Sequence, residues 1–121
     1  MDFQVQKNSQ LNRIFDSLLL DELKYYSKKN PTQESCGIIV KENNLLKFIA
    51  CDNKSINPSC FFVIDSNIII DYDVEYIFHS HTIGSANPSI KDIRVSDELC
   101  IPFLIYSLKD DDFYLYDNIS V

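Results

Sequence analysis

The sequence has no tryptophan, only two glycines and only two histidines among its 121 residues. Phenylalanine and tyrosine supply the aromatic bulk, and hydrophobic residues make up 45% of the chain, which is enough to build a packed core. No internal repeat, linker or low-complexity tract interrupts the sequence. Its length therefore predicts one domain over residues 1–121.

Long hydrophobic runs are also absent. The longest, residues 18–20 and 68–70, are far too short to cross a bilayer. Residues 1–4 lack the basic and apolar regions of a secretory signal. We therefore expect no membrane partner and a cytoplasmic location.

Basic residues are scarce, with 11 lysines and arginines against 18 aspartates and glutamates and a formal net charge of −7. This balance argues against nucleic-acid binding, which normally needs a basic surface to neutralise phosphates. Residues 110–112 form a run of three aspartates that we interpret as a solvated turn.

The four cysteines, at positions 36, 51, 60 and 100, do not form a C-x-x-C pair. This spacing disfavours a zinc ribbon and a thioredoxin-like motif. Without a sign of secretion, free thiols in a reducing compartment are expected. We interpret all four as small apolar residues that pack in the core.

Apolar residues recur at helical spacing over residues 9–29, with Ser9 as the N-cap and Asn30-Pro31 as the stop. A second helix is predicted over residues 89–99. Short strands are predicted over residues 36–41, 45–51, 61–64, 74–81, 103–107 and 113–116, with a turn at 42–44. This order predicts the α/β fold class, with one mixed β-sheet flanked by helices.

The two histidines, His79 and His81, are two residues apart on a predicted strand. Side chains on a strand alternate between faces, so both imidazoles point the same way. Neutral imidazole is a good zinc ligand. A His-x-His pair alone is nevertheless weak evidence for a metal site.

Asp92 is the candidate for a third ligand. It lies eleven residues beyond His81, and Ser89 can cap the intervening helix start, which puts Asp92 in the first helical turn. Its side chain can then face back towards the strand. Ser-x-x-Asp alone is an ordinary helix-start signal, but three convergent ligands with one position left for water are typical of a catalytic zinc site.

These residues resemble the JAMM/MPN metalloprotease family. Residues 79–81 (His-Ser-His), followed by seven residues, Ser89, two residues and Asp92, match the H-x-H-x7-S-x2-D signature without a gap. Residues 34–37 (Glu-Ser-Cys-Gly) resemble the Glu-x-Cys-Gly element of the family. The resemblance implies a fold like that of cytidine deaminases.

The resemblance also implies a role for each residue. Zn2+ would be the cofactor, with His79, His81 and Asp92 as its ligands. Glu34 would be the general base, taking a proton from the zinc-bound water and passing it to the leaving amine. Ser89 would help to hold the oxyanion of the tetrahedral intermediate.

Several neighbouring residues leave alternatives open. Without the zinc ligands, Glu34 reads as a surface carboxylate before a strand. Cys36 is disfavoured as a nucleophile, because a cysteine enzyme needs a histidine base free of metal. Gly37 and Gly84 permit close backbone approach or unusual turns, or are ordinary strand and turn glycines. Thr82 stands where many family members have proline.

Within the family, the sequence is similar to the N-terminal JAMM domain of phage tail-assembly proteins of the K type. The shared features lie in residues 31–37, 51–53, 62–65, 79–81, 87–89 and 101–107. This similarity implies a metallopeptidase or isopeptidase that acts on a tail component or a ubiquitin-like protein. For a phage-encoded protein, the expected location is the host cytoplasm or the virion tail.

Two alternatives share the same ligands. One is a non-catalytic tail-tip protein that zinc stabilises, in which a fourth protein ligand closes the site. The other is a processing enzyme that trims the tail of a ubiquitin-like sulfur carrier ending in Gly-Gly.

Overall fold

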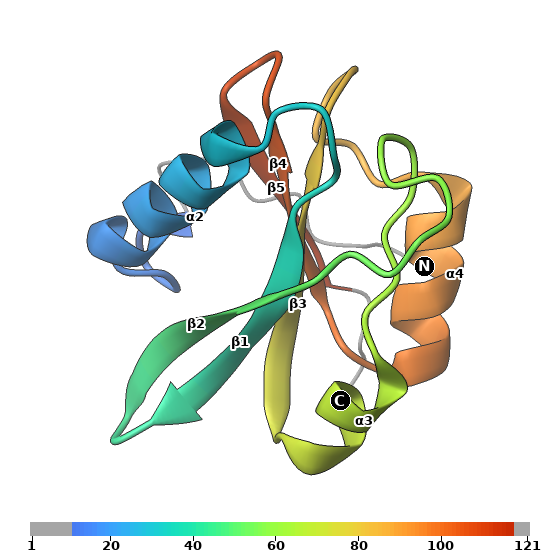
Figure 1. The fold of residues 1–121 in the computed structure, drawn as a ribbon. Helices are drawn as coiled ribbons and strands as arrows, with labels where there is room; N and C mark the ends of the chain where they lie inside the picture. The colour runs from blue at the N-terminus through green and yellow to red at the C-terminus, as the bar shows by residue number, and fades with distance from the viewer. Residues whose placement is uncertain (1–10, 118–121) are drawn as a thin grey trace.

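Five strands form one mixed sheet with helices on both of its faces (Figure 1). The computed structural model describes residues 11–117. The strands are β1 (Cys36–Glu42), β2 (Leu45–Cys51), β3 (Val74–His81), β4 (Phe103–Ser107) and β5 (Asp112–Tyr116). The helices of the described residues are α2 (Ser17–Lys29), α3 (Ser66–Asp71) and α4 (Ile90–Leu99). The predicted α/β class, a mixed sheet flanked by helices, is confirmed at this level.

The strand order is β2-β1-β3-β4-β5. β1 runs antiparallel to β2 and β3, β4 runs antiparallel to β5, and only β3 and β4 are parallel neighbours. A parallel pair needs a crossover connection, and α4 supplies it. The chain therefore leaves the carboxyl end of β3 and returns along α4, and such strand ends are where open α/β sheets commonly bind ligands.

Each face of the sheet has its own core. α2 packs on one face, and α3 and α4 lie on the other (Figure 1). Alternation along β3 sends Phe78 into the core under α2 and Ile77 into the core on the α4 side. His79 and His81 share the face of Ile77, so both imidazoles lie on the α4 side.

The predicted N-terminal helix is wrong as one continuous element. α2 begins at Ser17, where the Asp16 carboxylate accepts a hydrogen bond from the Leu18 backbone N–H at 2.9 Å. Residues 12–15 form a turn and a bend instead, although Leu11 and Phe15 are fully buried. Apolar residues at helical spacing are therefore buried here without belonging to one continuous helix. The predicted cap Ser9 lies outside the described residues, and the helix ends at Lys29 as predicted.

The predicted strand over residues 61–64 is also wrong, and helix α3 was missed. Residues 61–64 pair with no strand of the sheet, and the Asn53 side chain holds their backbone instead. Asn53 Nδ2 donates to the Phe61 carbonyl at 2.9 Å, and its Oδ1 accepts from the Val63 N–H at 3.1 Å. α3 contains three consecutive isoleucines, which favour strands in sequence reasoning, but its start is capped by Asp65.

The interpretation of the cysteines is confirmed in part. Cys36 and Cys51 are buried in the core on the α4 side, whereas Cys60 and Cys100 are exposed, contrary to the expected packing. All four are free thiols. The aspartates of residues 110–112 are exposed around the β4–β5 turn, as expected.

Gly37 is needed for close packing between β1 and β2. A Cβ at this position would lie 2.5 Å from the Ile49 carbonyl oxygen and would overlap the Phe48 ring. Gly84 instead has a positive φ of 81° in the loop after β3, a conformation that favours glycine. None of the helices within residues 11–117 is long and apolar enough to cross a membrane.

Candidate metal centre

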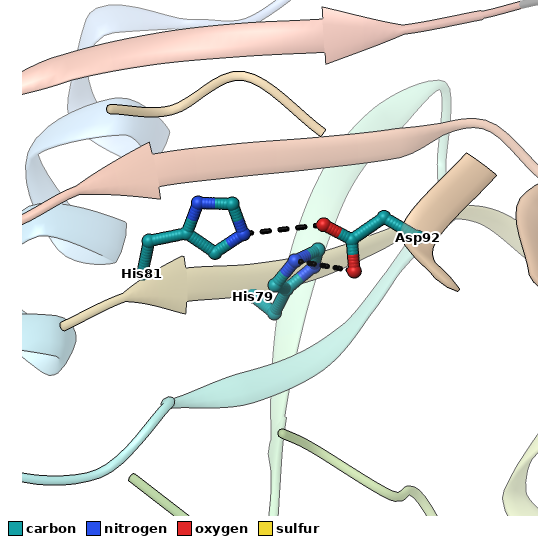
Figure 2. Close-up of side chains that lie close together, drawn as sticks. All are labelled: His79, His81 and Asp92. Carbon is teal, nitrogen blue, oxygen red and sulfur yellow. Dashed lines mark hydrogen bonds and ion pairs between the residues drawn. The ribbon is translucent and has the colours of Figure 1, made fainter. Parts of the chain in front are cut away.

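His79, His81 and Asp92 meet on the α4 side of the sheet (Figure 2). The His79 Nε2 atom lies 3.3 Å from Asp92 Oδ1, and His81 Nε2 lies 3.2 Å from Asp92 Oδ2. One ligand atom from each of the three residues falls within 4.8 Å of the other two. The convergence that the sequence predicted is therefore present, and the group could hold a metal ion.

The start of α4 positions Asp92. Ser89 is the N-cap, and its Oγ accepts a hydrogen bond from the Asp92 N–H at 3.0 Å. The Ser89 N–H in turn donates to Asp92 Oδ2 at 2.9 Å. This capping box turns the carboxylate back towards β3, as the sequence predicted. The box uses the Ser89 oxygen as an acceptor, so its O–H remains able to donate.

The tautomer of His81 follows from its neighbours. Its Nδ1 lies 2.8 Å from the Ser85 carbonyl oxygen, which can only accept, so Nδ1 carries a hydrogen. In the neutral ring, Nε2 then presents a lone pair to Asp92 Oδ2 at 3.2 Å. Two lone pairs at this distance require a cation between them, either a proton or a metal ion.

His79 has a different environment. It is fully buried, stacks on Phe62 with ring centroids 4.3 Å apart, and meets the edge of Phe103. Among the described residues, neither of its ring nitrogens has a partner in hydrogen-bond geometry. An unpaired buried polar atom is costly. A metal ion at Nε2 would remove part of that cost.

Burial and charge set the protonation of the three groups. Burial lowers the pKa of His79, which keeps its imidazole neutral and able to bind a metal. Burial also works to lower the pKa of His81, but the hydrogen bonds to Asp92 and Ser85 outweigh it and raise that pKa. Burial disfavours the Asp92 carboxylate, yet the two histidines and the Ser89 N–H hold its pKa well below the usual range.

Two imidazole nitrogens and a carboxylate are a donor set that zinc accepts. Zinc bonds to histidine nitrogen and carboxylate oxygen of roughly 2.0–2.2 Å in a tetrahedral site put the ligand atoms about 3.3 Å apart. The two nitrogen–oxygen separations here are 3.3 and 3.2 Å, each to a different oxygen of Asp92, and one ligand atom from each residue lies within 4.8 Å of the others. Within residues 11–117, no fourth histidine, cysteine or acidic side chain joins the group. Three protein ligands with an open position are the arrangement of catalytic rather than structural zinc sites.

Glu34 lies beside this group. Its side chain is 7% exposed and lines a cavity that His81, Ser89 and Asp92 also line. Burial raises the pKa of Glu34 to about 8; the nearby His81 opposes this shift and Asp92 adds to it. A divalent cation at the centre would favour the carboxylate form and lower that pKa. Glu34 is thus a buried carboxyl at the candidate centre, and the interpretation as a surface carboxylate is wrong.

The segment around Glu34 is fixed by residues whose part in the site the sequence did not indicate. The Glu34 N–H donates to the Pro58 carbonyl at 2.7 Å, and Asn53 Nδ2 donates to the Glu34 carbonyl at 2.9 Å. The next N–H, of Ser35, donates to the buried Ser80 Oγ at 2.8 Å. Ser80 lies between the two histidines but on the opposite face of β3, so nothing in the sequence linked it to the glutamate.

Cys36 follows Glu34 closely but does not join the site chemistry. It is fully buried, and burial raises the pKa of its thiol to about 12. A thiol that stays protonated is a poor nucleophile. This environment agrees with the rejection of a cysteine mechanism.

Comparison with known proteins defines the fold only. No protein-family model matches the sequence, and no curated protein matches it. Among solved structures, the chain is similar to protein DSY2949 from Desulfitobacterium hafniense, with a TM-score of 0.62 and 18% sequence identity. The match covers 84% of this chain and 82% of that one.

Proposed function

We propose that the protein is a zinc-dependent metallopeptidase or isopeptidase of the JAMM type. One observation carries the proposal: a three-ligand group with an open position borders the same cavity as a buried glutamate. The JAMM signature in the sequence supports the assignment of the ligands and the base. The proposed setting, phage tail assembly with a tail component or ubiquitin-like protein as substrate, rests on the sequence similarity alone.

In this proposal the residues divide the chemistry between them. Zinc, when bound, supplies a Lewis acid that acidifies water and polarises the scissile carbonyl. Glu34 takes a proton from the attacking water, whose oxygen bonds to the carbonyl carbon. The same carboxyl then returns the proton to the amide nitrogen as the C–N bond breaks. The Ser89 O–H donates to the oxyanion.

The open position also distinguishes this proposal from a structural zinc site. A tail-tip protein that used zinc only for stability would close the site with a fourth ligand. Within the described residues, the three ligands have no fourth companion, and Glu34 belongs to the cavity wall instead. This arrangement favours hydrolysis.

The test combines metal analysis with a peptidase screen. We expect one zinc per chain and hydrolysis of members of a mixed peptide library by the wild type. Glu34→Gln should keep zinc and lose about 10²–10⁴-fold in rate, since it removes the base but no ligand. His81→Ala should lose zinc. Unchanged turnover in Glu34→Gln would remove the glutamate from its proposed role, and a wild type that binds no zinc would overturn the proposal.

A further inference from the structure

An apolar cavity of about 330 Å³ extends from the candidate metal centre into the space between α4 and residues 60–64. Its apolar walls come from residues 60–64, both helices on this side of the sheet and the sheet itself. The walls include Phe62, Val63, Ile64, Ile69, Val95 and Phe103. The proposed metal ligands and general base do not explain why the protein has an apolar cavity at this place.

The cavity combines mostly apolar walls with a few polar groups. Glu34, His81, Ser89, Lys91 and Asp92 line it together with the apolar residues. A cavity that is mostly apolar, with a few convergent polar groups, is the usual form of a ligand site. Here Glu34, His81, Ser89 and Asp92 are the groups proposed to act on an amide bond. A ligand that fills the apolar part would therefore carry its amide towards the metal centre.

Hydrogen bonds fix the part of the cavity wall formed by residues 60–64. Asn53 fixes the backbone of residues 60–64 through hydrogen bonds to Phe61 and Val63, and the same amide holds the Glu34 carbonyl. Lys91 Nζ of α4 lies 4.4 Å from the centre of the Phe61 ring, so a cation–π contact joins α4 to this segment. The cavity wall and the catalytic glutamate are thus tied to one side chain, which couples the shape of the cavity to the position of the base.

Size and charge define the occupant. An engineered protein cavity of about 150 Å³ holds benzene, so about 330 Å³ accommodates a whole phenylalanine, leucine or methionine side chain. The mostly apolar walls disfavour a charged side chain in the cavity, because burying a charge without a partner is costly. A Gly-Gly tail has no side chain and would leave the cavity unfilled.

We propose that this cavity binds a large apolar side chain of the peptide substrate, next to the amide bond that is cleaved. This inference deepens the proposed hydrolase function and rests on it. It favours a substrate with phenylalanine, leucine or methionine beside the cleavage point. It disfavours the Gly-Gly end of a ubiquitin-like carrier.

The experiment compares capped peptides acetyl-Ala-Ala-X-Ala-Ala-amide, in which X is phenylalanine, leucine or glycine. With zinc present, we measure kcat/KM for the wild type and map each cleavage product by mass spectrometry. Binding is measured separately by NMR titration of labelled Glu34→Gln protein. The phenylalanine and leucine peptides should exceed the glycine peptide by about 10- to 100-fold in both measurements, as burial of a large apolar side chain provides.

Variants on α4 assign the preference to the cavity. Val95→Phe fills it and should reduce the preference to about threefold or less while leaving zinc content unchanged. Arg94→Phe places the same side chain at the adjacent exposed position, outside the cavity lining, and should keep the preference. Leu99→Phe, at a wall residue that is 40% exposed, is a second filling variant should Val95→Phe not fold.

The outcomes separate the two proposals. Hydrolysis without a side-chain preference, or a preference that survives both filling variants, overturns the cavity proposal and leaves the hydrolase in place. Selective binding that the filling variants abolish, without turnover in the wild type, supports the cavity and overturns the hydrolase. Absence of both turnover and selective binding overturns both.

Discussion

In the metal-free protein, the burial of Glu34 and its proposed role as a base favour opposite protonation states. It is buried, which favours the protonated carboxyl, yet a general base must be ionised. The neighbouring Asp92 strengthens the first tendency and His81 the second. The ionised form of such a buried carboxyl is stabilised when a cation is present, and such local cost is common at functional sites.

The first prediction at the residue scale is that Glu34→Gln stabilises the metal-free protein at high pH. The pKa of this carboxyl is 4.5 in its ordinary state and about 8 in the folded protein. Its contribution to stability is therefore complete below pH 4.5 and is lost as pH rises through 8. We expect Glu34→Gln to raise the free energy of unfolding by about 1–3 kcal/mol near pH 9 and to change it little near pH 5.

Urea denaturation of zinc-free wild type and variant at the two pH values provides the measurement. Glu98→Gln, which changes an exposed carboxyl on α4, is the matched control and should have little effect at either pH. An equal effect of Glu34→Gln at both pH values would contradict the assignment of burial as the cause.

At the scale of elements, α4 contributes through its first turn. Ser89 caps the helix and orients Asp92, and the proposed mechanism also uses its hydroxyl as an oxyanion donor. These two roles differ in the chemistry they need. A cap needs an acceptor oxygen, whereas the oxyanion needs a donor at that place.

Two substitutions separate these roles. Ser89→Ala removes the cap and the hydroxyl, and should lower the free energy of unfolding by about 1 kcal/mol. Ser89→Gly removes the side-chain donor but leaves a residue that is tolerated at the N-cap, and should cost only a few tenths of a kcal/mol of stability. If the hydroxyl acts on the oxyanion, both variants lose a similar factor in kcat. Full activity in Ser89→Gly would limit Ser89 to capping.

Elements with strong local signals were predictable from the sequence, and those held by distant contacts were not. The bounds of β2, β3 and β4 were predicted without error, because each is an apolar or alternating run bounded by turn residues. Residues 61–64 have the same composition, but the Asn53 side chain, rather than a neighbouring strand, satisfies part of their backbone. Three isoleucines likewise concealed helix α3, whose Asp65 cap was the one local signal.

The candidate site was likewise predictable where local rules decide it and not where distant contacts do. The alternation of β3 and the cap of α4 placed His79, His81 and Asp92 together, since both rules act over a few residues. The burial of Glu34 was not predictable from its neighbours. The segment around Glu34 is fixed by Asn53, which donates to the Glu34 carbonyl, and by Ser80, which accepts from the Ser35 N–H, and both contacts form only once the sheet has formed.

On the scale of the whole molecule, a metal ion at this centre would join the sheet to a helix on its α4 side. His79 and His81 belong to β3 and Asp92 to α4, so a cation bound by all three is a cross-link between two layers (Figure 2). An ion that binds the folded chain and not the unfolded one stabilises it by mass action. Metal binding and folding should therefore be linked, and protons should oppose both.

The last prediction is that zinc raises the melting temperature at neutral pH and that this increase shrinks as the pH falls. Protons compete for the imidazoles, and His81 should compete first because its pKa is raised by Asp92 and Ser85, whereas burial lowers the pKa of His79. Differential scanning calorimetry with zinc and with a chelator, from about pH 7.5 to about pH 5, measures the difference. His81→Ala should show almost no zinc effect at any pH. A zinc-induced increase that stays constant down to the acid end would show that these histidines are not its ligands.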